Sequence, residues 1–242
     1  MKKVYIITVQ KAPNFGAYLQ AYALYRYIAD LGHDCSIIDL LRPVHKDFVH
    51  TKGYDPYLKL NFKQKLRRKY KKIQQAFLKC VCYSQFKEMQ IAKFRFQEFD
   101  RLIKYTRTYK SIKDLYDNPP IGDIFITGSD QLWNPTQYYC LEPYFLTFVK
   151  GKAKKISYAT SIGISELPLN VIKDFKKWLS SYDFISVREI EAKRILIQGG
   201  IKDDIEKVCD PTFLLSSSKW KSLAVQPKEG KKYIFLFTLY GD

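Results

Sequence analysis

The first forty residues restrict the fold more than any other stretch, because two apolar runs flank a segment with helical periodicity. The runs are KVYIIT at 3–8 and CSIIDL at 35–40. Five apolar residues between them recur at the spacing of one helix face, and Gly32 follows them: Ala17, Ala21, Leu24, Ile28 and Leu31. Two strands joined through a helix of this length require a crossover, which is the unit of a parallel sheet covered by helices. This stretch therefore predicts an α/β fold.

Later segments continue the same alternation of strands and helices. Strands are expected at 123–127, 155–160, 184–187 and 206–209, and helices at about 168–181 and 190–198. The succession predicts a doubly wound, mostly parallel, Rossmann-like sheet over residues 1–215. Asp210 and Thr212 are expected to mark the end of this domain.

The region after residue 215 predicts a change of domain. Residues 216–230 are expected to form a linker that holds a short helix around Trp220. The apolar run at 233–239 is typical of a central strand that is buried on both faces. Because such a strand needs partner surface, we expect 231–242 to be the first strand of a second, truncated Rossmann-like domain.

A basic helical insertion is predicted at about 42–83, where the alternation stops. Residues 59–72 contain eight Lys/Arg residues and no acid. Apolar residues recur at helical spacing within and beyond this run: Phe62, Leu66, Tyr70, Ile73 and Phe77. Two interpretations stay open, a solvated basic face and a helix that lies on an anionic membrane surface. A second helix is expected to follow, with one apolar face: Met89, Ala92, Phe96, Phe99 and Ile103.

The net charge of +17, from 41 Lys+Arg and 24 Asp+Glu, favours anionic partners. These partners are nucleic acid, phosphorylated substrates or an acidic membrane surface. The sequence shows no helix-turn-helix, zinc-finger or RNP-type signature, so nucleic acid is the least favoured of the three.

The cysteines and the apolar runs indicate a cytoplasmic protein. The five cysteines form no CxxC pair, and Cys35 and Cys209 fall in expected core strands, which favours reduced thiols. Cys80 and Cys82 have no suitably spaced metal ligands nearby, so no metal is expected. The first apolar run is too short for a secretory signal, and no run reaches the roughly 20 residues of a membrane span.

The loops that follow the expected strands make one candidate site. In open α/β sheets, ligands bind outside the carboxyl ends of the strands. The substrate-binding candidates in these loops are Asn14, Gly16, Ala17, Gly128, Ser129, Gln131, Trp133, Ser161, Gly163 and Glu189, and the catalytic candidates are Asp130 and Arg188. Neither GxGxxG nor GxxxxGK[ST] is present, which argues against a dinucleotide oxidoreductase and a P-loop ATPase.

Five short motifs, in this order, resemble the polysaccharide pyruvyl transferase family. They are NFGA with LQAYAL at 14–24, GSDQLWN at 128–134, SYATSIG at 157–163, SVRE at 186–189 and DPT at 210–212. The resemblance implies two Rossmann-like domains, as in GT-B glycosyltransferases. It also implies transfer of a pyruvyl group from phosphoenolpyruvate to hydroxyls of a glycan or lipid-linked oligosaccharide, with phosphoenolpyruvate as co-substrate and no bound cofactor.

The second domain of this family usually supplies a basic cluster with a His and an Arg. His33, His45 and His50 lie far upstream and do not correspond to that cluster. The alternatives are therefore a sugar-nucleotide glycosyltransferase on the same fold, an inactive scaffold and a nucleic-acid-binding protein.

The family's chemistry suggests roles for three candidates, each with a plainer alternative. The planar fork of Arg188 suits a carboxylate or phosphate, or the side chain pairs with Glu189 or Glu191 at the surface. Asp130 accepts a proton or hydrogen bond from the sugar hydroxyl, or caps a turn. Trp133 stacks on a sugar ring, or belongs to the core.

Overall fold

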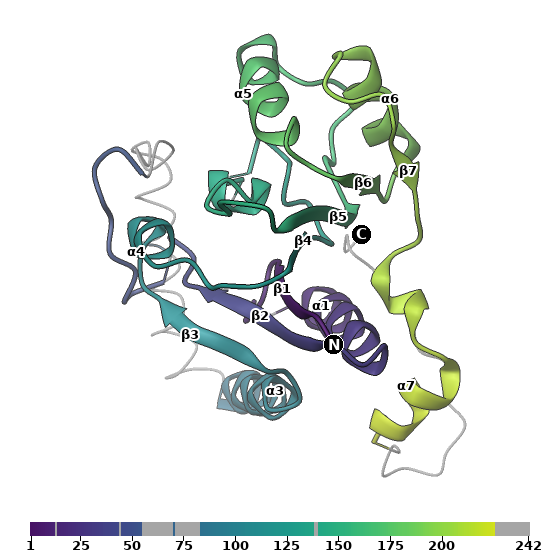
Figure 1. Ribbon diagram of the computed structural model, residues 1–242. Helices are drawn as coiled ribbons and strands as arrows, with labels where there is room; N and C mark the ends of the chain where they lie inside the picture. The colour runs from purple at the N-terminus through teal and green to yellow at the C-terminus, as the bar shows by residue number, and fades with distance from the viewer. Residues whose placement is uncertain (13, 44, 55–69, 71–82, 138–139, 226–242) are drawn as a thin grey trace.

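A single parallel sheet organises the computed structural model, which describes residues 1–12, 14–43, 45–54, 70, 83–137 and 140–225. Seven strands in these residues pair in the order β3-β2-β1-β4-β5-β6-β7, and Figure 1 follows the sheet from one edge to the other. The strands are β1 (Lys3–Ile7), β2 (Asp34–Leu40), β3 (Tyr105–Tyr109), β4 (Ile124–Thr127), β5 (Lys154–Thr160), β6 (Phe184–Val187) and β7 (Glu206–Lys207). Every strand pair is parallel, which confirms the predicted α/β fold.

The helices cover both faces of the sheet. They are α1 (Phe15–Asp30), α3 (Tyr83–Asp100), α4 (Ile112–Asp117), α5 (Leu169–Leu179), α6 (Ile190–Gln198) and α7 (Ser217–Leu223), with short 3₁₀ helices η1 (Glu142–Phe145) and η2 (Pro211–Leu214). Figure 1 shows α1 beside β1 and β2, and α5 and α6 over the half of the sheet that holds β5 to β7.

The central strand β1 shows why both faces need cover. Side chains alternate between the faces of a strand. Val4 and Ile6 pack with buried residues of α1, whereas Tyr5 and Ile7 pack with residues of α4, α5 and η1 on the other face. All four side chains are buried, so the apolar run of β1 has no solvent-facing position.

Helix α1 begins and ends close to its expected limits. The side chain of Asn14 accepts a hydrogen bond from the Ala17 N–H at 3.1 Å, and Gly32 follows the helix. Ala17, Ala21 and Leu24 are buried as predicted, but Leu31 lies beyond the last turn and is 56% exposed. Its assignment to the buried stripe was therefore wrong.

The sheet resumes earlier than the sequence predicted, because β3 and α4 precede β4. The segment YTRTY of β3 alternates polar residues, and β3 lies at the edge of the sheet with a partner on one side only in the described residues. An edge strand needs little apolar surface, so its sequence lacks the signal that marks β1.

After β7 the chain returns to α1. Strand β7 ends at Lys207, so Cys209 lies outside it and is exposed, which corrects its assignment to a core strand. The predicted short helix around Trp220 is α7, whose Trp220 ring lies 6.0 Å from the Tyr22 ring of α1. Lys219 forms an ion pair with Asp30 of α1.

Several predictions fall outside the described residues. These are the basic helix at 59–72 apart from Tyr70, Cys80 and Cys82, and the strand at 231–242. Of the second predicted helix face, Phe96 and Phe99 of α3 contact α1 aromatics, while the side chains of Met89 and Ala92 are not described. Within the described part of the chain, no helix is long and apolar enough to cross a membrane.

Candidate functional site

The strand order brings the predicted loops together. Strands β1, β4, β5 and β6 are consecutive neighbours and all parallel, so their carboxyl ends meet at one edge of the sheet. The loops that carry Gly16, Asp130, Gly163 and Arg188 follow these four strands. The predicted convergence of these loops on one edge is therefore present, while the roles of the residues in binding stay predictions.

The edge contains a topological switch point between β1 and β4. From β1 the chain adds β2 and β3 on one side, and from β4 onward it adds strands on the other side. At such a point the two loops diverge to opposite faces of the sheet and leave a crevice for a ligand. The loop at 8–14 and the loop at 128–131 flank this switch point.

Gly128 and Gly163 allow the loops to pack closely. A Cβ at Gly128 would lie 2.0 Å from the carbonyl oxygen of Tyr158, at a φ of +127°. At Gly163, which has a φ of +65°, a Cβ would lie 2.7 Å from the side chain of Gln131. Both glycines therefore have a steric reason, whatever their role toward a ligand.

Asp130 directs the chain from β4 toward β5. It has a φ of +82°, and its Oδ1 accepts the N–H of Gln131 at 2.7 Å. Its carbonyl oxygen accepts the N–H groups of Leu132 at 2.8 Å and Ser161 at 2.9 Å. The carboxylate therefore caps a local turn, as the plainer alternative stated, and remains partly exposed at the edge of the sheet.

The ion-pair partner of Arg188 is Asp210. Its Nη1 donates to Asp210 Oδ2 at 3.1 Å, so the predicted pairing with Glu189 or Glu191 was wrong. Asp210 Oδ1 is held by the N–H and hydroxyl of Thr212 at 3.0 and 2.8 Å. The guanidinium is 31% exposed and has five donors, so it can contact an anion while it stays oriented by Asp210.

Glu189 connects the β6 loop to the β5 loop. The hydroxyl of Ser161 donates to Glu189 Oε1, and Ser161 itself is fully buried. The other carboxylate oxygen, Oε2, is buried and has no hydrogen-bond partner in the described residues. Ser161 therefore acts on the site through Glu189 rather than through its own surface.

Trp133 belongs to the core. Its side chain is fully buried, its Nε1 donates to the Tyr144 carbonyl oxygen at 3.2 Å, and its ring stacks on Phe145 at 5.5 Å. No face of the ring is open to a sugar, so the stacking role predicted for Trp133 is not available in this structure.

The exposed aromatic ring at this edge is Phe15, which the sequence analysis did not select. It is the first residue of α1 and is 65% exposed, and its ring lies 4.8 Å from that of Phe96. An apolar side chain in a strand-end loop, beside the exposed Asn14 and Gly16, was the signal that could have identified it.

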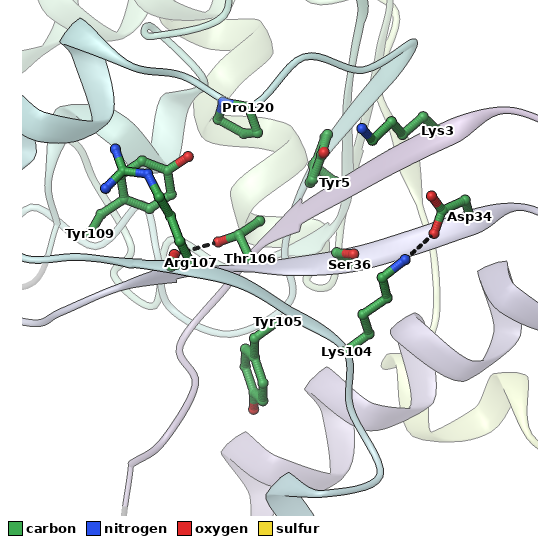
Figure 2. Close-up of a pocket in the computed structure, with 10 residues that line it drawn as sticks. All are labelled: Lys3, Tyr5, Asp34, Ser36, Lys104, Tyr105, Thr106, Arg107, Tyr109 and Pro120. Carbon is green, nitrogen blue, oxygen red and sulfur yellow. Dashed lines mark hydrogen bonds and ion pairs between the residues drawn. The ribbon is translucent and has the colours of Figure 1, made fainter.

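Two grooves, of 340 and 460 Å³, lie at the opposite end of the strands and contain none of the predicted residues. Figure 2 shows the first, where Lys104 reaches Asp34 and the Arg107 guanidinium lies over Tyr109. Lys104 contacts Asp34 at 2.6 Å and Arg107 contacts Asp114 at 2.8 Å. Because these two cations are already paired, the strand-end loops are the better candidate site.

Fold and loops together define the class of protein: a doubly wound, Rossmann-like α/β protein with polar loops gathered at its switch point. Among families, the polysaccharide pyruvyl transferase model matches residues 14–241. The chain therefore belongs to that family, as its motifs suggested. Neither a search of curated proteins nor a search of solved structures found a match.

Proposed function

We propose that the protein transfers a pyruvyl group from phosphoenolpyruvate to hydroxyls of a sugar during synthesis of a cell-surface polysaccharide. Its membership of the polysaccharide pyruvyl transferase family supports a transferase role. The observation that carries the finer proposal is the position of Arg188, a partly exposed guanidinium oriented by Asp210 at the carboxyl end of β6.

The reaction sets three physical requirements. A cationic group must hold the carboxylate and phosphate of the donor, an acid must protonate its methylene carbon, and a base must accept the protons of the attacking hydroxyls. The central carbon forms one bond to each sugar oxygen, and its bond to the phosphate oxygen breaks. Phosphate leaves with the electron pair of that bond.

Arg188 and Asp130 meet two of these requirements in the proposal. Arg188 binds the carboxylate or phosphate of the donor through its free N–H groups. Asp130, whose carboxylate is partly exposed, accepts the proton of a sugar hydroxyl. The proton donor to the methylene carbon is left to a group outside this set.

The proposed setting is the cytoplasm, with the protein peripheral at the inner face of the membrane. The acceptor is then a glycan or lipid-linked oligosaccharide. Support comes from the net charge of +17 and from the basic segment at 59–72.

The test measures phosphate release from phosphoenolpyruvate by the full-length protein with and without a panel of sugar acceptors. We expect release to depend on the acceptor and to fall about 100-fold or more in Arg188→Ala, as for other groups that stabilise developing charge. Arg101→Ala is the matched control, because Arg101 is an exposed arginine paired with Glu98 at the end of α3. We expect this variant to match the wild type.

Two outcomes would contradict the proposal. Full-length protein that leaves phosphoenolpyruvate intact across a broad panel removes its main support. Calorimetric binding of nucleotide sugars, with no response to phosphoenolpyruvate, would instead support a glycosyltransferase.

A further inference from the structure

Gln20 lies at the junction between α1 and the Asp130 loop and is only 3% exposed. Its Oε1 accepts the backbone N–H of Ser129 at 3.1 Å, across 109 residues of sequence. Its Nε2 lies 3.0 Å from the Thr8 hydroxyl and 3.0 Å from the Ala17 carbonyl oxygen, and both accept from it. The amide therefore uses both its acceptor and its donors to join β1, α1 and the loop after β4.

Thr8 completes the contact from the end of β1. Its hydroxyl, which is fully buried, donates to the carbonyl oxygen of Ser129 at 3.2 Å while it accepts from Gln20. Gln20 and Thr8 thus hold the N–H and the C=O of the same residue. On the other side, the Ser129 hydroxyl donates to the Ala159 carbonyl oxygen of β5 at 2.9 Å.

The fixed residue immediately precedes Asp130. A peptide chain held at Ser129 and again at the Asp130 carbonyl oxygen, which accepts the Ser161 N–H, has little freedom to change where Asp130 leaves the sheet. A buried backbone N–H that loses its partner is costly, so a change at Gln20 is transmitted directly to this loop.

We propose that Gln20, with Thr8, is a positioning residue that fixes the Ser129 peptide and thereby aims Asp130 at the substrate. The inference rests on the proposed function for its catalytic consequence, but not for the contact itself. A glutamine that only fills the core would affect stability without altering the pH dependence of turnover.

The decisive variant is Gln20→Glu, which keeps the shape but makes the contact depend on protonation. A neutral carboxyl still donates to the Ala17 oxygen or to Thr8, whereas a carboxylate donates to neither and faces carbonyl oxygens. Burial raises the pKa of a carboxyl at such a position. We expect kcat close to that of the wild type at about pH 5.5 and about tenfold lower at about pH 8, with KM values nearly unchanged.

Gln198→Glu is the matched control. Gln198 is exposed at the end of α6, where it accepts a hydrogen bond from Arg194 at 2.8 Å. The same chemical change there should leave the pH profile of the wild type unaltered.

Hydrogen exchange at the Ser129 N–H tests the contact without any assay of activity. Compared with the wild type at the same pH, we expect faster exchange in Gln20→Glu above neutral pH, with no change at Ile37 in β2. If the wild type does not act on phosphoenolpyruvate, the proposed function fails while the exchange result still decides whether Gln20 fixes this loop.

A pair of variants at Thr8 guards against a misfolded glutamate variant. Thr8→Val removes the hydroxyl and Thr8→Ser keeps it, so we expect Val to lower kcat and to speed exchange at Ser129, and Ser to restore both. Wild-type exchange and turnover in both Gln20→Glu and Thr8→Val, over the whole pH range, would overturn the inference.

Discussion

Gly128 lies where the carbonyl oxygen of Tyr158 leaves room for a hydrogen atom only. We expect Gly128→Ala to lower the free energy of unfolding by about 3 kcal/mol, from overpacking and an unfavourable positive φ together. Gly151 is the matched control, because it has a φ of +79° but no atom within 4 Å of its ideal Cβ. Gly151→Ala should cost about 1 kcal/mol from the backbone alone. Urea unfolding measures both, and equal losses would contradict the close approach at Gly128.

Phe15 offers the exposed ring that Trp133 does not. If it contacts the acceptor sugar, Phe15→Ala should raise the KM for the acceptor about threefold to tenfold, and Phe15→Tyr should not. The matched control is Phe184→Ala, since Phe184 is 59% exposed at the amino end of β6, away from the site. An unchanged acceptor KM in Phe15→Ala would remove Phe15 from the site.

At the scale of elements, the ion pair between Arg107 of β3 and Asp114 of α4 joins the edge strand to the helix that follows it. The two guanidinium nitrogens lie 3.0 and 2.8 Å from the two carboxylate oxygens. The hydrogen bonds from Arg107 lower the pKa of Asp114 below its ordinary value of 3.8. A carboxyl with a lowered pKa stabilises the folded state above its ordinary pKa, and that contribution is lost as the pH falls through the folded value.

We expect Asp114→Asn to lower the unfolding free energy by less than about 1 kcal/mol at pH 7, because the pair is partly exposed. The difference from the wild type should shrink as the pH falls below 3.8. The double variant with Arg107→Gln should cost little more than the single variant, because both lose the same pair. Urea unfolding at neutral and acid pH measures these differences, and a deficit that persists in acid would contradict the ion pair as its cause.

At the scale of the whole molecule, the surplus of positive charge favours an anionic surface. The sequence prediction that residues 59–72 bind such a surface can be separated from the effect of net charge. We expect replacement of Lys65, Arg67, Arg68 and Lys69 by Glu to abolish sedimentation with vesicles of anionic lipid.

A control with the same change in net charge replaces four exposed lysines elsewhere: Lys150, Lys152, Lys173 and Lys176. This variant should keep most of its binding to the vesicles. An equal loss in both variants would show that net charge, rather than the segment, determines binding.

Much of the sheet could be predicted because its central strands carry local signals. The runs of β1 and β2 and the periodicity of α1 lie within forty residues, and burial on both faces requires continuous apolar sequence. Strand β3 gave no such signal because an edge strand of alternating polar residues needs none. The strand-end loops followed from the strands, since parallel topology places all carboxyl ends at one edge.

The sequence by itself determined the α/β class, the family and the loops in which the candidate site lies, because each depends on residues that are neighbours along the chain. Only the tertiary structure decided that Trp133 is a core residue, that Arg188 pairs with Asp210 across 22 residues and that Gln20 holds Ser129 across 109. These facts depend on side chains that meet after the sheet has formed. Local periodicity contains no record of such meetings, and so it left each of these side chains with more than one role.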